Sequence, residues 1–299
     1  MSALPNAASF FARLPRFFRR HKLIVGWMRW TKENTIQLVP VYGNTKGYAD
    51  LSEGMLRLIL IDSGFEADFF NLAQKLLPFN GVFFDVGANF GLMSVGLAGE
   101  VAPQATLHIF EPNPRLSPWI EKSLRNLGHR QFHINQCAVS DFTGTIRMSI
   151  NPEHTGESHI SIDGNETVNC IRLDDYVRDR QISRIDLMKL DVEGFELTAL
   201  KGMSESLQRG VVKCLYFEFM KKWLARHGDP LELLNFLDHC GFEIFYCRPH
   251  DLEKFATESA KHEVMIGNQK LRLAKVDVSQ TPEHTDLLAI HSSLLGPTT

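Results

Sequence analysis

Two short segments combine residue types that could hold a nucleoside-containing cofactor. Residues 82–92 read Val-Phe-Phe-Asp-Val-Gly-Ala-Asn-Phe-Gly-Leu, and residues 107–112 read Leu-His-Ile-Phe-Glu-Pro. Each begins as an apolar run typical of a buried strand and reaches an acidic residue, Asp85 or Glu111. Glycines let the backbone approach a ligand, and a carboxylate after the next strand can accept hydrogen bonds from two ribose hydroxyls. The two segments therefore predict a site for an adenosine-containing cofactor.

The glycine spacing distinguishes between such cofactors. A dinucleotide site typically reads G-x-G-x-x-G and places a pyrophosphate at a helix N-terminus. Here the loop reads Gly87-Ala88-Asn89-Phe90-Gly91, and it follows Asp85, whose charge would repel a pyrophosphate. S-adenosylmethionine (SAM) carries an ammonium and a sulfonium and no phosphate, so the loop favours SAM. A tight turn between a core strand and a helix would give the same spacing by itself.

Four ordered segments resemble one family. Residues 185–202 resemble the segment DLxKxDxEGxExxxLxG of the FkbM family of methyltransferases. Asp85–Gly91 is similar to that family's D-V-G-A-N-x-G motif, Glu111–Pro114 to its second motif, and Leu173–Val177 to its LDDY segment. The resemblance covers residues 80–220 and continues more weakly to the C-terminus. It implies a class I SAM-dependent methyltransferase.

The resemblance also implies which residues hold SAM. The residues of the first loop would surround its methionine part, namely Asp85, Gly87, Ala88, Asn89 and Gly91. Glu111 would hold the ribose. The segment from Ala138 to Asp141 would flank the adenine. Asp141 could accept from the adenine amino group, or it could equally be a turn residue.

Methyl transfer to a hydroxyl needs a nearby base or metal, because an alcohol is a poor nucleophile at neutral pH. The candidate bases are Asp191, Glu193, and the histidines His154 and His159 of the polar segment 142–172. A single loop histidine is often simply solvated. Asp191, Glu193 and Glu218 would suit Mg²⁺, but the sequence does not show metal dependence, so we predict no metal ligands.

Lys189 interrupts a strand that should be buried. Leu187, Lys189 and Asp191 share one face, since side chains alternate along a strand. A buried ammonium is costly unless it is paired or deprotonated, and its partners could be Asp191, Glu193 or Glu218. We favour a structural ion pair over a direct part in proton removal.

The elements that position these residues alternate between apolar runs and helical patterns. This alternation predicts a Rossmann-like α/β fold, with a mostly parallel sheet and helices on both faces. Strands are expected at 82–86, 106–110, 132–139, 186–191, 212–219 and 242–247, and helices at 91–100, 114–127, 194–208 and 229–240. Asp286–His291 predicts a last, antiparallel strand. Residues 142–172 predict a hairpin or lid beside the site, and residues 249–284 give no clear pattern.

The bulk properties suit one large domain with an extension. The chain has 299 residues, of which 44% are hydrophobic and 22% charged. We assign residues 1–50 to a basic, aromatic N-terminal extension and residues 51–299 to the methyltransferase domain, with its core at about 80–250. The net charge of −3 gives no case for a nucleic acid partner.

The N-terminal segment has two interpretations. Residues 1–32 contain seven basic residues, no acidic residue and several Phe and Trp side chains. This composition could contact an anionic membrane surface from the inner face. It could also form a helix that packs its aromatic side chains on the domain, which we favour because Pro15 interrupts the only long helical window.

The five cysteines are scattered without a C-x-x-C spacing, and no apolar stretch reaches the roughly 18 residues that span a bilayer. Both observations favour a cytoplasmic protein. The sequence therefore predicts a SAM-dependent methyltransferase that O-methylates a sugar or polyketide-like metabolite, as a small molecule or glycan. The alternatives are a nicotinamide-dependent oxidoreductase, which would require the missing G-x-G-x-x-G, and a non-catalytic membrane-associated protein that retains the fold.

Overall fold

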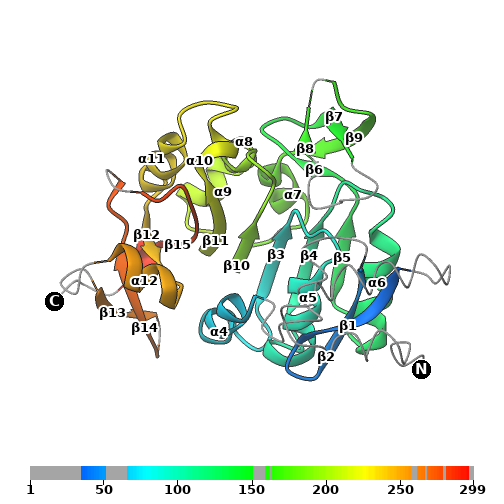
Figure 1. Ribbon diagram of the computed structural model, residues 1–299, viewed down its shortest axis with the longest axis horizontal. Coiled ribbons are helices and arrows are strands. Elements are labelled where there is room, and N and C mark those ends of the chain that lie inside the picture. The colour runs from blue at the N-terminus through cyan, green and yellow to red at the C-terminus, as the bar shows by residue number, and fades with distance from the viewer. Residues whose placement is uncertain are drawn as a thin grey trace, which may run out of the picture.

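The centre of the molecule is a nine-stranded sheet. The computed structural model describes residues 35–51, 66–150, 159–161, 163–256, 261–266, 268–278 and 281–295. The strand order is β13-β14-β12-β15-β11-β10-β3-β4-β5 (Figure 1). Five parallel strands form its core: β3 (Val82–Val86), β4 (Thr106–Phe110), β5 (Phe132–Asn135), β10 (Ile185–Leu190) and β11 (Val212–Met220).

An antiparallel strand lies inside the other half of the sheet. β15 (His284–His291) pairs antiparallel with β11 on one side and with β12 (Phe242–Tyr246) on the other. The predicted last strand and its direction are therefore confirmed. This insertion, together with the parallel core, gives the expected class I methyltransferase sheet.

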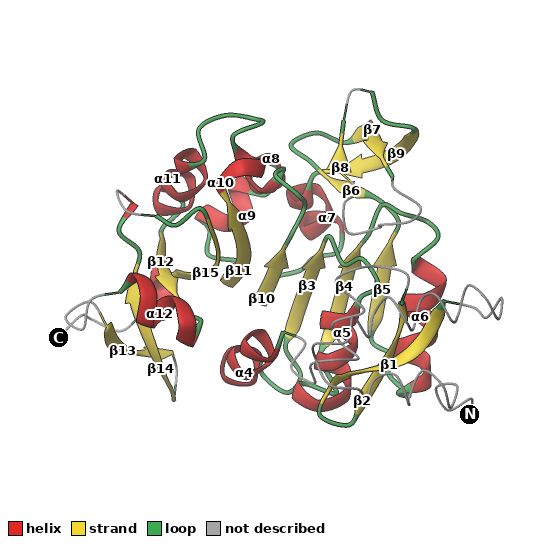
Figure 2. Cartoon of the chain, in the orientation of Figure 1, coloured by secondary structure: helices red, strands yellow, loops and turns green. Residues whose placement is uncertain are grey.

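Helices cover both faces of the sheet, as predicted (Figure 2). Phe83 and Leu187 share one core cluster with α4 (Ala67–Leu76), α5 (Leu92–Gly96), which passes into a π-helix (Leu97–Val101), and α6 (Ser117–Asn126). Phe84 and Met188, one residue along the same strands, pack against α7 (Leu173–Asp179), α8 (Glu196–Lys201), α9 (Ser204–Gln208) and α11 (Leu231–His239). The alternation of side chains along each strand produces these two cores.

Two predicted elements are each divided in the structure. The strand expected at 132–139 ends at Asn135. The side-chain amide of Asn135 donates to the backbone oxygen of Ile109 at 3.1 Å, at the end of the pairing between β4 and β5. The chain then forms β6 (Ala138–Val139) in a different sheet. The helix expected at 194–208 bends at Gly202, where a Cβ atom would lie 2.0 Å from the backbone oxygen of Ser140. Close approach of two backbones therefore interrupts the helical pattern.

A small second sheet follows β5. Its order is β6-β9-β7-β8, formed by β6, β7 (Gly144–Ser149), β8 (His159–Ile160) and β9 (Glu166–Ile171). Because β6 begins just after the carboxyl end of β5, this sheet stands at the edge of the large sheet where ligands bind in such folds (Figure 1). The hairpin predicted beside the site is thus present within residues 142–172.

The described part of the predicted N-terminal extension is a hairpin. β1 (Ile36–Tyr42) and β2 (Thr45–Asp50) pair antiparallel, and β2 packs on α5 and α6. Val39, Val41 and Ala49 are buried in the same core cluster as α4 and α5. Residues 1–32, with their two interpretations, lie outside the described residues. None of the helices in the described ranges is long and apolar enough to cross a bilayer.

Residues 249–284, which gave no pattern, extend the sheet beyond β12. The segment contains α12 (Pro249–Phe255) and a hairpin of β13 (Lys261–Ile266) and β14 (Gln269–Lys275), which pairs with the end of β12. The remaining short elements are α10 (Lys221–Leu224), directly after β11, and a 3₁₀ turn at Ser292–Leu294.

Candidate active site

The loop after β3 is held between the neighbouring strands. The backbone N–H groups of Gly87 and Ala88 both donate to the backbone oxygen of Phe110, at 3.0 and 3.1 Å. Gly87 has a φ of 76°, and a Cβ atom there would lie 1.7 Å from the backbone oxygen of Asp191. Gly91 also has a positive φ, of 66°, and precedes α5. Only glycine fits at position 87, because any side chain would collide with the end of β10.

Glu111 closes this loop from the end of β4. One of its carboxylate oxygens accepts the N–H of Asn89 at 2.7 Å, and the other accepts the N–H of Asn113 at 2.9 Å. The side chain is buried, and burial raises the pKa of Glu111 to about 7 against the opposing effect of these hydrogen bonds. The structure therefore brings the first loop and Glu111 together. Each carboxylate oxygen keeps a second lone pair for a further donor.

Asp85 is fully buried beneath the loop. Its Oδ2 accepts the hydroxyl of Ser94 at 2.6 Å and the N–H of the same residue at 3.3 Å. Its Oδ1 is buried and has no hydrogen-bond partner within the described residues. Burial raises the pKa of Asp85, and the charge of Lys189 opposes this shift. An unpaired buried carboxylate oxygen is costly, so a cationic ligand group would be stabilised beside it.

The predicted adenine segment lies at the start of the small sheet. Ala138 is buried in β6, paired with Cys170 of β9. Asp141 is exposed after β6, and its Oδ1 accepts the hydroxyl of Ser140 at 3.2 Å. Because β6 follows β5 directly, both residues lie at the same edge of the large sheet as Glu111. Contact with adenine remains a prediction for Ala138 and Asp141.

Lys189 forms the predicted ion pair. Its Nζ lies 2.9 Å from Oδ2 of Asp191 and 3.3 Å from the backbone oxygen of Gly87. Burial alone would lower the pKa of Lys189, but the nearby charges of Asp191 and Asp85 outweigh it and raise the pKa. The ammonium stays charged and connects the end of β10 to the loop after β3. Asp85 is also the register partner of Lys189 on β3.

The turn after β10 holds Glu193 in an unusual conformation. Glu193 has a φ of 53°, which non-glycine residues rarely adopt, and Gly194 follows with a φ of 98°. Burial raises the pKa of Glu193 to about 8, and the charges of Asp191 and Glu218 add to the effect. The turn is fixed by Glu196, whose Oε1 accepts the N–H of Val192 at 3.2 Å and that of Gly194 at 3.1 Å.

Two residues of this region were missed by sequence reasoning. Glu196 is buried and has a structural role in the turn, which its place in the E-G-x-E pattern could have suggested. His284 begins β15, and its Nε2 lies 2.9 Å from Oε1 of Glu218 on β11. Burial and the charge of Asp191 raise the pKa of Glu218, while His284 opposes the shift. The antiparallel register that joins Glu218 and His284 cannot be read from either segment alone.

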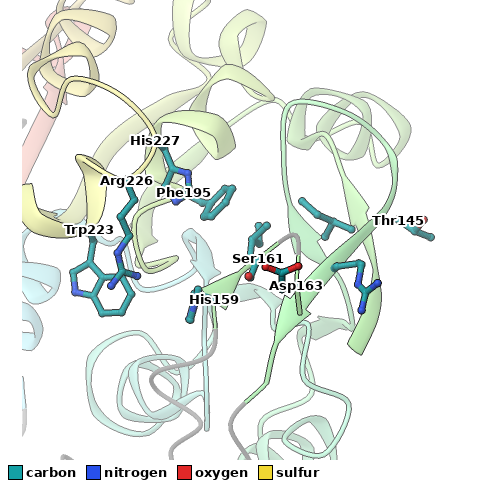
Figure 3. Close-up of a pocket in the computed structure, with 11 residues that line it drawn as sticks. Thr145, His159, Ser161, Asp163, Phe195, Trp223, Arg226 and His227 are labelled. Atoms are coloured by element: carbon teal, nitrogen blue, oxygen red, sulfur yellow. The ribbon is translucent and has the colours of Figure 1, made fainter. Parts of the chain in front are cut away.

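The histidines expected in the lid have different outcomes. His154 lies outside the described residues. His159 is on β8, where its ring lies 5.9 Å from that of Trp223. It lines a cavity of about 1210 Å³ between the small sheet and the segments that follow β10 and β11 (Figure 3). In the described ranges, no group of three His, Cys, Asp or Glu side chains is arranged to hold a metal ion.

Comparison with known proteins places these features in one family. The model of the methyltransferase FkbM domain matches residues 85–244. The chain is 32% identical to methyltransferase sdnD of Sordaria araneosa over 46% of its length and 66% of the relative. It is 30% identical to the 31-O-demethyl-FK506 methyltransferase FkbM of Streptomyces tacrolimicus, over 42% of this chain and 60% of the relative.

A further relative is the hexuronic acid methyltransferase AglP of Haloferax volcanii. The two chains are 28% identical over 48% of this chain and 58% of AglP. This chain thus spans less than two thirds of the length of these three relatives. The matches favour methyl transfer over nicotinamide-dependent oxidation.

Proposed function

This chain belongs to the FkbM family of methyltransferases, and we propose on that premise that it transfers the methyl group of SAM to a hydroxyl oxygen. The observation that carries the proposal is the loop Gly87–Gly91, closed against Glu111 by the N–H of Asn89. The names of two relatives support the acceptor class. One is named as acting on an O-demethyl compound, and the other on a hexuronic acid. A small molecule or glycan with a free hydroxyl is therefore the proposed acceptor.

The residues of the loop fit SAM on two observations. The unpaired Oδ1 of buried Asp85 would be satisfied by a cationic group, and Gly87 leaves no side chain between the loop and its neighbours. Glu111 would accept from the ribose hydroxyls through its remaining lone pairs. Ala88, Asn89 and Gly91 would complete the contact with the methionine part. SAM supplies an electrophilic methyl group on a positively charged sulfur, which departs as a neutral thioether.

Glu193 is our choice for the general base. A base works best when its pKa is close to the working pH, and the pKa of Glu193 is about 8. Its ionised carboxylate would take the proton of the acceptor hydroxyl as the oxygen bonds to the methyl carbon. Asp191 is 37% exposed and ion-paired with Lys189, so it would orient the hydroxyl. His154, also a candidate base, lies outside the described residues.

Isothermal titration with SAM tests the proposal. Wild-type protein should bind SAM, and Glu111→Gln should bind at least about tenfold more weakly, because a carboxylate is a stronger hydrogen-bond acceptor than an amide. The matched control is Glu121→Gln, which removes an exposed carboxylate paired with Arg125 on α6 and should bind SAM like wild type. Absence of SAM binding by the wild type, or equal binding by Glu111→Gln, would refute the proposed cofactor site.

The cellular setting is a second part of the proposal. All five cysteines are unpaired, which supports a reducing, cytoplasmic compartment. If residues 1–32 contact an anionic membrane surface instead of packing on the domain, the protein would also be peripheral to the inner face of the membrane. Co-sedimentation with anionic liposomes should then be lost when residues 1–32 are deleted, while SAM binding persists. Equal co-sedimentation of both proteins would exclude that segment as the anchor.

A further inference from the structure

The cavity beside the small sheet has aromatic and basic walls. His159 on β8 lines the side formed by the small sheet (Figure 3), and Arg147 on β7 of the same sheet is also among the lining residues. Phe195, which follows Gly194, and Trp223 of α10 line the opposite side together with Arg226 and His227. The rings of Phe195 and His227 lie 4.1 Å apart, so this side presents a largely aromatic surface.

The side chain of Arg226 has an orientation that suits the binding of an anion. Its guanidinium lies over the ring of Trp223, with 3.9 Å between the guanidinium carbon and the ring centroid. Stacking on an aromatic face leaves the in-plane N–H groups free to form the two parallel hydrogen bonds that a carboxylate or phosphate accepts. Within the described residues, the Arg226 side chain has no carboxylate partner. The stacking therefore fixes the orientation of the guanidinium, and no described carboxylate neutralises its charge.

The surrounding charges favour an anion in the cavity. Arg147 is fixed in the wall by two hydrogen bonds from its guanidinium to the backbone oxygen of Gly164, at 3.1 and 2.6 Å. Asp163 is the one acidic residue among those that line the cavity in the described part, and it is exposed. Burial and the charge of Arg226 lower the pKa of His227, so this ring stays neutral and the positive charge of the cavity comes from the arginines. This cationic surface contrasts with the chain's net charge of −3.

The cavity adjoins the turn that holds the proposed base. Phe195 is two residues after Glu193, and a Cβ atom on Gly194 would lie 2.9 Å from the backbone oxygen of Trp223. The turn after β10 therefore connects Glu193 through Gly194 to Phe195, which belongs to the aromatic wall of the cavity. A molecule that extends from the cavity past Phe195 would bring a hydroxyl group toward the turn that carries this carboxylate. Asp191, which follows β10, and Glu218, on β11, are acidic and would repel the anionic end of such a molecule.

We propose that this cavity is the acceptor subsite and that it selects an anionic saccharide, with Arg226 binding its carboxylate or phosphate. The sugar ring would lie against Trp223 and Phe195, since large aromatic faces bury the apolar face of a ring. The anion would fix the orientation of the ring, so that one hydroxyl faces Glu193. This inference rests on the proposed methyl transfer, because it assigns the acceptor of that reaction.

Saturation-transfer NMR on the full chain tests the subsite without SAM. The probes are methyl β-glucuronoside, glucose 6-phosphate and the neutral methyl β-glucoside. We expect both anionic probes to bind at least tenfold more tightly than the neutral one, and less tightly as salt is added. Tighter binding of the glucuronoside would identify a carboxylate acceptor, and tighter binding of the sugar phosphate would identify a phosphorylated one.

Substitution of the stacked arginine is the matched test. Arg226→Gln should weaken binding of the anionic probes at least tenfold and leave the neutral probe unchanged. Arg209→Gln, which removes an exposed arginine after α9, should behave like wild type. Equal binding of neutral and anionic sugars, no binding of either anionic probe at 10 mM, or full binding by Arg226→Gln would overturn the subsite.

The proposed methyl transfer and the proposed anionic subsite can be refuted independently of each other. Absence of SAM binding in the titration with wild-type protein would refute methyl transfer, whatever the sugars do. Normal SAM binding together with sugar binding that ignores charge would refute only the anionic subsite.

Discussion

The ammonium of Lys189 lies 2.9 Å from a carboxylate oxygen of Asp191, which is two residues further along the chain and directly follows the end of β10. A lysine in the middle of a buried parallel strand would otherwise be strongly unfavourable. The pair also contacts the backbone oxygen of Gly87, so one cation joins the cofactor loop to the proposed acceptor edge. Its charge additionally offsets that of fully buried Asp85.

Replacing this lysine should destabilise the protein. Lys189→Met leaves the carboxylates of Asp85 and Asp191 without their cation, which should cost about 3 kcal/mol, the low end for a broken buried pair. The low end applies because Asp191 is 37% exposed. Thermal and urea unfolding give the difference, with Lys201→Met, at the exposed end of α8, as the control. Equal stability of both variants would contradict the central role of Lys189.

The same variant should show an altered pH dependence of stability. Burial raises the pKa of Asp85, and loss of Lys189 removes the charge that opposes this shift. A carboxyl group whose pKa is higher in the folded state stabilises the fold at low pH, and this stability is lost as pH rises. Unfolding of Lys189→Met should therefore become progressively more favourable, relative to wild type, over the pH range above the ordinary pKa of an aspartate, about 4. A constant difference across that range would argue against Asp85 as the source.

SAM binding should depend on the ionisation of Glu111. The pKa of Glu111 in the free protein is about 7, and only the ionised carboxylate keeps all its acceptor sites. Affinity should thus fall roughly tenfold for each pH unit below 7, with proton release on binding. Isothermal titration in buffers of different ionisation enthalpy measures both effects. Glu111→Gln should lose this dependence, and a flat profile for the wild type would rule out the linkage.

Glu193 should govern the pH profile of methyl transfer. Since its pKa is about 8, kcat/KM should rise with pH up to that value and then level. Glu193→Gln should lower the rate about 10² to 10⁴-fold and abolish the rising limb, while SAM binding is retained. Transfer of labelled methyl groups to an acceptor sugar gives the rates. Glu205→Gln, exposed on α9, is the control, and an unchanged profile in Glu193→Gln would assign the base to another residue.

Gly87 can be compared with a second glycine that has the same φ angle. Gly87 and Gly128 both have a φ of 76°, but an added Cβ atom meets Asp191 in the first case and nothing within 4 Å in the second. Gly128→Ala should lower the free energy of unfolding by about 1 to 2 kcal/mol, which is the cost of a left-handed backbone conformation for a residue with a Cβ atom. Gly87→Ala should cost more and also abolish SAM binding. Unfolding and titration of both variants separate collision from conformational strain, and equal losses would show that collision is unimportant.

Local patterns were sufficient to predict the parallel core. Apolar runs that end in Asp85, Glu111 and Asp191 gave the strands around the site. The alternation along the expected strand 186–191 predicted that Lys189 needs an acidic partner, and Asp191 was one of three candidates. These local patterns could not predict contacts between segments that are distant in the sequence. The partnership of Glu218 with His284 depends on the register between β11 and β15, and the bend at Gly202 depends on the approach of Ser140.

The hairpin β1–β2 was missed for a similar reason. The hairpin forms a separate two-stranded sheet, and its valines pack on α4 and α5. The sequence of the hairpin alone therefore did not indicate what it packs against. Hydrophobic segments of this kind find their partners only in three dimensions.

The small sheet is an insertion between the third and fourth parallel strands, and none of its described strands joins the large one. Changes in its length or sequence would remodel one wall of the cavity while the turn after β3 and Glu111 keep their geometry. On the proposed function, one wall of the acceptor subsite and the loop that would surround the methionine part of SAM therefore belong to separate stretches of chain. Divergent members of such a lineage could exchange this module to reach new substrates without rebuilding the catalytic framework.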